Sequence, residues 1–101
     1  MTREQFIYVI RPTRLGILTE GPTPQEEEIL GRHFSYLKNL YGSGAVLLAG
    51  RTQDADETSF GIVILSAASE AEAREIMLGD PAVQEGVMAP EFHPYRVAIP
   101  Q

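Results

Sequence analysis

Two helix-start signals constrain the fold of this 101-residue chain more than any other feature. The segments "TPQE" (23–26) and "SEAE" (69–72) each place a Ser or Thr three residues before a Glu, which is the capping-box pattern of a helix N-terminus. Pro24 also suits the first helical position. After the first signal, apolar residues recur at helical spacing: Leu30, Phe34, Leu37 and Tyr41. We therefore predict a long helix that ends at Gly42 and a shorter one that reaches Leu78.

Four short runs rich in β-branched and aromatic residues surround these helices and predict strands. They are "QFIYVIRP" (5–12), "AVLLAG" (45–50), "FGIVILS" (60–66) and "EFHPYRVAI" (91–99). The polar loop "RTQDADETS" between the second and third runs favours a hairpin-type connection. Pro94 has no backbone N–H to donate, so we expect the last strand to lie at a sheet edge.

The element order βαββαβ predicts one domain over residues 1–101, a ferredoxin-like α+β sandwich with an antiparallel sheet. Two helices can cover only one face of that sheet. Alternation in the first strand leaves apolar residues on both faces: Phe6, Tyr8 and Ile10 on one, Ile7 and Val9 on the other. We therefore expect a homodimer in which two sheets pack against each other.

Glycine, proline and aspartate mark the breaks between these elements. Residues 12–23 contain glycine or proline breaks at three places, Pro12, Gly16 and Gly21–Pro22, and are expected to form a loop. Gly79 is expected to take the left-handed conformation that closes a helix. Asp80 can then cap a further helical turn, whose first position suits Pro81. An acid held at this helix start could also orient a base.

The composition excludes several classes of site and partner. The chain has no cysteine, so disulfides, thiolate nucleophiles and cysteine-type zinc sites are excluded. A net charge of −6 argues against nucleic acid, because binding to its phosphates requires a basic surface. The start "MTREQFIYVI" lacks a signal-peptide pattern, and no apolar run approaches the roughly 20 residues of a membrane span. We expect a cytoplasmic protein with no membrane partner.

His33 is the main candidate for chemistry. It shares a face of the first predicted helix with residues 29, 37 and 40, so its side chain should point toward the sheet. One interpretation is a boundary histidine that hydrogen-bonds to backbone. The other is proton transfer, because a half-buried imidazole can change its charge near neutral pH.

The other polar candidates belong to weaker patterns. His93 is interpreted as an edge or interface side chain, and its distance from His33 along the chain gives a weak metal motif, so no metal site is predicted. Arg11 and Arg51 fall at strand ends, where they could bind an anionic substrate or only balance surface charge. No phosphate loop or dinucleotide fingerprint is present, so no cofactor is predicted. The acidic loop after the second strand is interpreted as a solvated turn: Asp54, Asp56 and Glu57.

Several segments, taken in order, match a known pattern. They are His33 followed by "YLKNL", then "GAVLLAGR", a glycine-bearing strand, "SEAEAREIMLGDPAVQEGV" and "EFHPYRV". Over about residues 6–98 the chain resembles the YCII-related (YciI-like) family. The resemblance implies a fold of the dimeric α+β barrel type and a His–Asp pair in a pocket, carried here by His33 and Asp80. One branch of that family is linked to dehydrochlorination of a chlorinated hydroxyhydroquinone without a cofactor.

Three functions stay open at this point. The first is a small cofactor-free enzyme in which His33 transfers a proton, Asp80 fixes its tautomer, and a small aromatic or enolisable substrate undergoes elimination or isomerisation. Its candidate substrate-binding residues are Tyr8, Arg11 and Arg51. The second is a non-catalytic ligand-binding or structural dimer, and the third a cofactor-free monooxygenase of the dimeric α+β barrel type. Both enzyme functions require His33 to face a cavity with Asp80 within hydrogen-bond reach.

Overall fold

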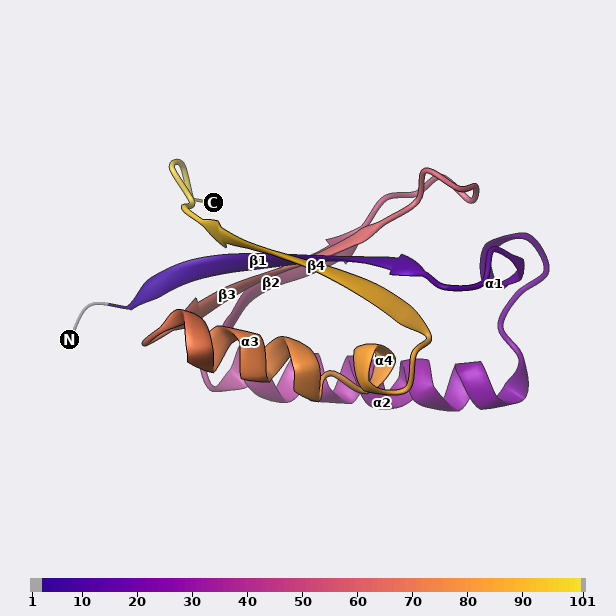
Figure 1. Cartoon of the computed structure of the whole chain (residues 1–101), viewed down its shortest axis with the longest axis horizontal. Coiled ribbons are helices and arrows are strands. Elements are labelled where there is room, and N and C mark those ends of the chain that lie inside the picture. The colour runs from indigo at the N-terminus through magenta and orange to yellow at the C-terminus, as the bar shows by residue number, and fades with distance from the viewer. Residues whose placement is uncertain (1–2, 101) are drawn as a thin grey trace.

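The computed structural model describes residues 3–100, which form one sheet and a layer of helices (Figure 1). The elements in chain order are β1 (Glu4–Pro12), α1 (Gly16–Thr19), α2 (Pro24–Gly42), β2 (Val46–Arg51), β3 (Gly61–Ala67), α3 (Glu70–Gly79), α4 (Pro81–Gln84) and β4 (Met88–Tyr95). The sheet has the order β2-β3-β1-β4, and every neighbouring pair is antiparallel. The predicted ferredoxin-like α+β fold is therefore confirmed.

The strand β4 lies at a sheet edge, as Pro94 predicts, but its bounds differ from the expected 91–99. It begins earlier because Met88 and the next residues pair with the end of β1, where Met88 faces Pro12. It ends at Tyr95, which faces Gln5 near the start of β1. Beyond that point β1 offers little further backbone to pair with, so the chain leaves the sheet.

Both predicted helix caps are present. The Thr23 hydroxyl accepts a hydrogen bond from the Glu26 backbone N–H at 3.1 Å, and the Glu26 carboxylate accepts one from the Thr23 N–H at 2.9 Å, which completes the capping box. The Ser69 hydroxyl accepts from the Glu72 N–H at 3.2 Å. These bonds satisfy donors that a helix start otherwise leaves unpaired.

The expectation of a left-handed Gly79 is wrong. Within residues 3–100, positive φ angles occur only at Gly21, Gly44 and Gly86, and Gly79 is the last residue of α3. Its small size has a different cause, because a Cβ atom at Gly79 would lie 2.9 Å from the Tyr36 hydroxyl oxygen. The glycine therefore lets α2 and α3 approach each other closely.

The expected loop at 12–23 also contains structure. Its middle forms the single helical turn α1, and Ile17 in this turn is buried. Ile17 packs against Ile29 and Val87 in a small apolar cluster apart from the main core. This contact gives the segment an apolar anchor, which its glycine and proline breaks do not reveal.

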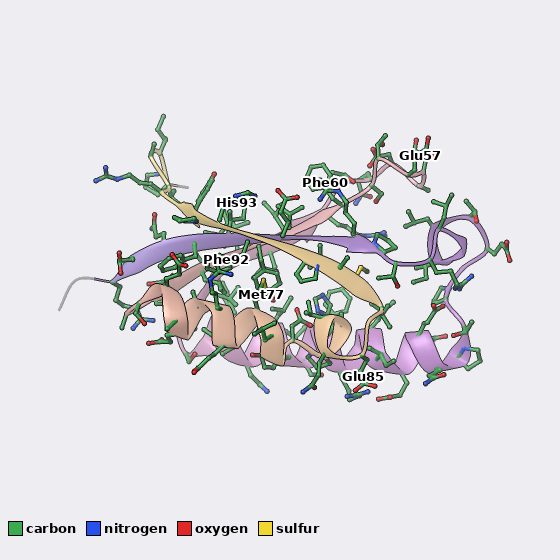
Figure 2. The ribbon with its side chains drawn as sticks, in the orientation of Figure 1. Glu57, Phe60, Met77, Glu85, Phe92 and His93 are labelled. Atoms are coloured by element: carbon green, nitrogen blue, oxygen red, sulfur yellow. The ribbon has the colours of Figure 1, made fainter. Side chains whose placement is uncertain are left out.

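The helices α2 and α3 lie on one side of the sheet, and the main core lies between the two layers (Figure 1). Phe6, Tyr8 and Ile10 of β1 point into this core. In Figure 2, Phe92 and Met77 lie between β4 and α3, whereas His93 points to the opposite side of the sheet. The alternation predicted for the strands is therefore confirmed, and no described helix covers the outer face.

Candidate functional site

The buried face of α2 carries His33 to the sheet. Ile29, His33 and Leu37 are the buried residues of this helix, one helical turn apart, and His33 is 8% exposed. The His33 Nδ1 atom lies 2.7 Å from Oδ1 of Asp80, although 47 residues separate the two along the chain. The histidine and aspartate that the family resemblance pairs are thus in direct contact.

Asp80 is fully buried and accepts three hydrogen bonds. Besides His33, the Tyr8 hydroxyl donates to Oδ2 at 2.7 Å, and the Ala82 backbone N–H donates to Oδ1 at 3.0 Å. The bond from Ala82 makes Asp80 the N-cap of α4, with Pro81 at the first helical position. Asp80 therefore caps a helix and orients a histidine at the same time.

The raised pKa values of two tyrosines indicate which side chains of this cluster donate hydrogen bonds. Burial, together with the charge of Asp80 and the hydrogen bond to it, raises the pKa of the Tyr8 hydroxyl far above its usual value. Burial and the charge of Asp80 also raise the pKa of Tyr36. Tyr8 therefore keeps its proton and acts as a donor, which leaves the Asp80 carboxylate as the acceptor for the His33 Nδ1–H.

This arrangement leaves the Nε2 atom of His33 for a ligand. Within residues 3–100 the only hydrogen bond of the His33 side chain is the one from Nδ1. No fully buried side-chain nitrogen or oxygen atom of these residues lacks a partner, so the unbonded Nε2 is not fully buried. His33 also lines a groove, which provides that access. With Nδ1 donating to Asp80, the neutral imidazole presents an acceptor at Nε2.

The groove has a volume of about 1020 Å³ and lies between α2 and the sheet at the β2 edge. One wall is α2, with Phe34 beside His33, and the floor includes Val46 of β2 and Val63 of β3. The far end is closed by the segment before α2, through Ile17. A volume of this size fits a small organic molecule.

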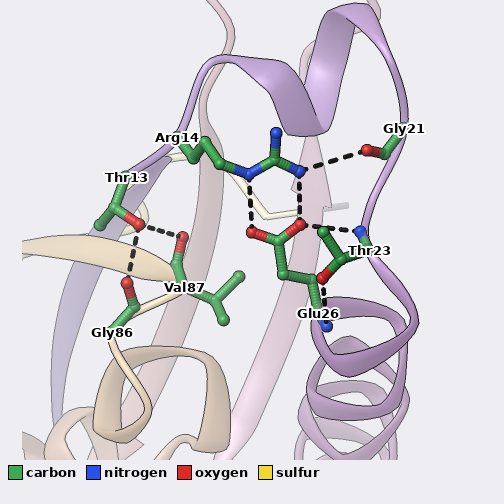
Figure 3. A network of polar contacts seen from close by, with 7 residues as sticks. All are labelled: Thr13, Arg14, Gly21, Thr23, Glu26, Gly86 and Val87. Atoms are coloured by element: carbon green, nitrogen blue, oxygen red, sulfur yellow. Dashed lines mark hydrogen bonds and ion pairs between the residues drawn. The ribbon is translucent and has the colours of Figure 1, made fainter.

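A polar network holds that end segment in place (Figure 3). The Arg14 guanidinium donates to Glu26 at 2.6 and 3.0 Å and to the Gly21 carbonyl at 3.3 Å. The Thr13 hydroxyl donates to the Gly86 carbonyl at 2.7 Å. The pKa of Glu26 is lowered to about 2. The main cause is the hydrogen bond from Arg14, and the hydrogen bond from the Thr23 backbone N–H and the charge of Arg14 add to it. The segment is therefore tied both to the start of α2 and to the turn after α4.

The structure separates the three residues expected to contact a substrate. Arg51 lines the groove. Arg11 lies on the outer face of the sheet, where it pairs with Glu91 at 3.1 Å and lies over the Phe60 ring. Tyr8 does not line the groove, because its hydroxyl is used by Asp80 in the core. The role expected for Tyr8 in binding a substrate stays a prediction, and the structure shows the contact of its hydroxyl with Asp80.

The exposed residues of α2 that border the groove are not singled out by sequence reasoning. Phe34 is 62% exposed and Tyr41 is 65% exposed, although both belong to the apolar periodicity that predicts this helix. Together with Lys38 they form a second stripe at spacings of four and three residues, along the mouth of the groove. In the sequence, the apolar residues of this helix cover a wider face than packing against the core requires.

The remaining candidates take no part in this site. His93 is exposed and contacts Glu91, whose pKa it lowers by hydrogen bonding and charge. No group of three or more His, Asp or Glu residues within 3–100 is arranged to hold a metal ion. Over the same residues, none of the helices has the length and apolar character needed to cross a membrane.

Comparisons with known proteins identify two similar folds and one domain family. No curated protein sequence matches the chain. The 5-chloro-2-hydroxyhydroquinone dehydrochlorinase (TftG) of Burkholderia phenoliruptrix AC1100, solved in complex with 2,5-dihydroxybenzoquinone, has a similar fold: TM-score 0.63, 19% identity, covering 90% of this chain and 93% of that one. An uncharacterised protein from Thermotoga maritima matches with a TM-score of 0.56 and 13% identity, covering 93% of this chain and 98% of that one.

These two likenesses concern the fold, since both identities are low. The sequence profile of the YCII-related domain matches residues 8–91, which include every residue of the His33 cluster. The match covers most of the chain. The protein belongs to the YCII-related domain family.

Proposed function

We propose that this protein is a small cofactor-free enzyme that uses His33 as a general base and acid on a small molecule bound in the groove. One observation carries the proposal: Asp80 is held by three hydrogen bonds and fixes Nδ1 of His33, while Nε2 remains accessible in a groove that His33 lines. A base whose tautomer is fixed by a buried carboxylate is the arrangement that proton transfer requires.

The chemistry follows from the two ring nitrogens. Nε2 takes a proton from the substrate, and the Asp80 carboxylate stabilises the imidazolium that forms. In an isomerisation the imidazolium returns the proton to another atom of the substrate. In an elimination the electron pair left by the proton expels a leaving group, and the proton passes to solvent.

Elimination or isomerisation suits this groove better than acyl transfer. Acyl transfer needs a nucleophile next to the base. The chain has no cysteine, and the groove-lining Ser59 accepts a hydrogen bond from Thr52 at 3.3 Å and donates none to His33 in the described residues. The similar fold of a dehydrochlorinase supports elimination, because loss of hydrogen chloride requires a base to remove a proton.

A non-catalytic ligand-binding protein is the second candidate. It is favoured by the open, mostly apolar groove, whose exposed Phe34 and Leu48 would bind a ligand whether or not His33 reacts. The two functions differ in one requirement. Only the enzyme needs the tautomer of His33 that Asp80 fixes.

The test combines chloride release with NMR of the imidazole nitrogens. Wild-type protein is offered 5-chloro-2-hydroxyhydroquinone and related chlorinated phenols, and free chloride is measured. We expect release by the wild type, a loss of about 10²-fold or more in His33→Gln, and a loss in Asp80→Asn. His93→Gln is the matched control, because it removes the other histidine, which is exposed and outside the groove, and it should react like the wild type.

Nitrogen-15 NMR of labelled histidine tests the geometry even where no compound in the panel reacts. Neutral His33 should carry its proton on Nδ1 in the wild type, and Asp80→Asn should give a mixture of tautomers. A wild-type His33 protonated on Nε2, or a His33→Gln variant as active as the wild type, would contradict the assignment of His33 as the base.

A further inference from the structure

The basic residues of the chain fall into two groups, those neutralised by ion pairs and those that are not. Of the eight Lys and Arg residues, five form ion pairs with a carboxylate within residues 3–100: Arg3, Arg11, Arg14, Arg32 and Arg74. The three that form none there are Lys38, Arg51 and Arg96. Two of these three, Lys38 and Arg51, line the groove.

Acidic side chains, unlike Lys38 and Arg51, are not found in the lining of the groove among the described residues. The chain has 14 Asp and Glu residues, yet none of them is among the described residues that line the groove. Asp80 lies behind His33, and its carboxylate is occupied by three hydrogen bonds. In a protein of net charge −6, the groove therefore carries two uncompensated cations and no facing acid.

The two cations lie on different walls of the groove. Lys38 belongs to the exposed stripe of α2, between Phe34 and Tyr41. Arg51 is the last residue of β2 and pairs in register with Gly61, which has no side chain. The remaining lining is mostly apolar, so the groove offers positive charge to a ligand whose body is apolar.

We infer that the ligand of this groove is a small organic anion, an apolar body that carries a carboxylate or a similar acidic group, held by Lys38 and Arg51 beside His33. This inference rests on the proposed function and names its substrate class. Uncompensated cations in a cleft with low-dielectric walls attract anions even when the protein as a whole is acidic. Guanidinium and ammonium groups then form charge-assisted hydrogen bonds with the anionic oxygens.

A pair of fluorescent probes tests this inference without requiring any reaction. The probe 8-anilino-1-naphthalenesulfonate has an apolar aromatic body and a negatively charged sulfonate. N-phenyl-1-naphthylamine has the same aromatic body without the sulfonate. We expect wild-type protein to bind the anionic probe more tightly than the neutral one. Because the probes are inert, their binding is independent of whether His33 acts as a base. Failure of this inference is thus distinguishable from failure of the proposed function.

The variants assign the charge contribution to individual residues. Lys38→Gln and Arg51→Gln should each weaken binding of the anionic probe by up to about fivefold, the upper end of the range for a solvent-exposed ion pair, and leave binding of the neutral probe unchanged. Arg96→Gln is the matched control, since it removes a cation that forms no ion pair within residues 3–100 and does not line the groove. It should bind both probes like the wild type. Near-ultraviolet circular dichroism verifies that each variant is folded.

Three outcomes would overturn the inference. The first is equal binding of the two probes by the wild type, which would indicate a neutral ligand. The second is an unchanged anionic affinity in both Lys38→Gln and Arg51→Gln, or the same loss in Arg96→Gln. The third is a wild type that binds neither probe, which would mean that a second copy or another segment of the chain fills the groove.

Discussion

At the scale of single residues, Asp80 combines two tasks that are usually carried by different side chains. One of its oxygens accepts from both His33 and the Ala82 backbone, and the other accepts from Tyr8. A buried carboxylate needs this many donors, because an unpaired buried charge costs several kcal/mol. The helix cap at Ala82 and the bond from Tyr8 therefore make it possible for an ionised acid to lie behind the histidine.

Tyr8→Phe tests this dependence. The change keeps the ring and removes the hydroxyl that donates to Oδ2 of Asp80. We expect a loss of about 1–3 kcal/mol in the free energy of unfolding, measured by urea denaturation, because the buried carboxylate oxygen is left without a partner. Tyr41→Phe is the control, since Tyr41 is 65% exposed, and it should lose little. Equal losses in the two variants would mean that the Tyr8 bond contributes nothing specific.

Helical spacing placed His33 on the buried face of its helix, and the Asp-Pro step predicted Asp80 as a cap; both are confirmed. The role of Tyr8 could not be predicted from the sequence. Alternation placed its side chain on the helix side of the sheet, but not whether the hydroxyl meets a ligand or another side chain. That depends on which residues 72 positions away in the chain lie opposite it.

At the scale of elements, the end segment of the groove depends on Glu26. Its carboxylate completes the capping box of α2 and binds Arg14, which is why its pKa lies near 2 instead of the ordinary 4.5. A carboxyl group whose pKa is lowered by folding stabilises the native state above its unfolded pKa. That stabilisation is lost as the pH falls through the folded pKa. The contribution of Glu26 is therefore present at neutral pH and disappears between about pH 4.5 and 2.

Glu26→Gln measures this contribution. Glutamine can still accept the hydrogen bond from the Thr23 backbone but cannot carry the charge that Arg14 binds. The variant should be less stable than the wild type in urea at pH 7, and the difference should shrink as the pH approaches 2. Glu28→Gln is the control, because Glu28 forms an exposed pair with Arg32 on the same helix. A difference that does not change with pH, or one that Glu28→Gln reproduces, would contradict the ion-pair explanation.

The elements themselves were largely predictable, since caps and periodicity are local signals. Thr23 and Ser69 begin the helices where the capping pattern placed them. The structure differs from the prediction where contacts between distant parts of the chain determine the local conformation. Strand β4 ends where β1 runs out of partners, Gly79 is small because Tyr36 lies against it, and α1 forms in a segment whose Ile17 finds an apolar cluster.

At the scale of the whole molecule, the outer face of the sheet is covered by none of the described helices (Figure 1). Ile7 and Val9 of β1 lie on this face beside Ile64 and Ile62 of β3, their partners in the sheet register. An apolar sheet face without a helix layer is the feature that a second sheet can bury. We propose a homodimer joined through this face.

Sedimentation at micromolar concentration tests the proposal. The wild type should have about twice the mass of the 11.1 kDa chain. Ile7→Glu places a charge on the outer face and should dissociate the dimer. It should also lower the stability of the fold, because association and folding are thermodynamically linked. Leu78→Glu is the control, since Leu78 is 58% exposed on α3, the opposite side of the sheet. A well-folded monomeric wild type would refute the dimer.

The position of Asp80 has a consequence for how such a protein can be redesigned. Because one carboxylate contacts a helix start, a strand and His33, a substitution at Asp80 that changes the surroundings of His33 also weakens the fold. The residues at the mouth of the groove contribute little to the stability of the fold, because Phe34, Lys38 and Leu48 are exposed and outside the core. An engineer who seeks to change what the groove binds should therefore leave His33, Asp80 and Tyr8 intact and randomise the mouth, where substitutions cost little stability.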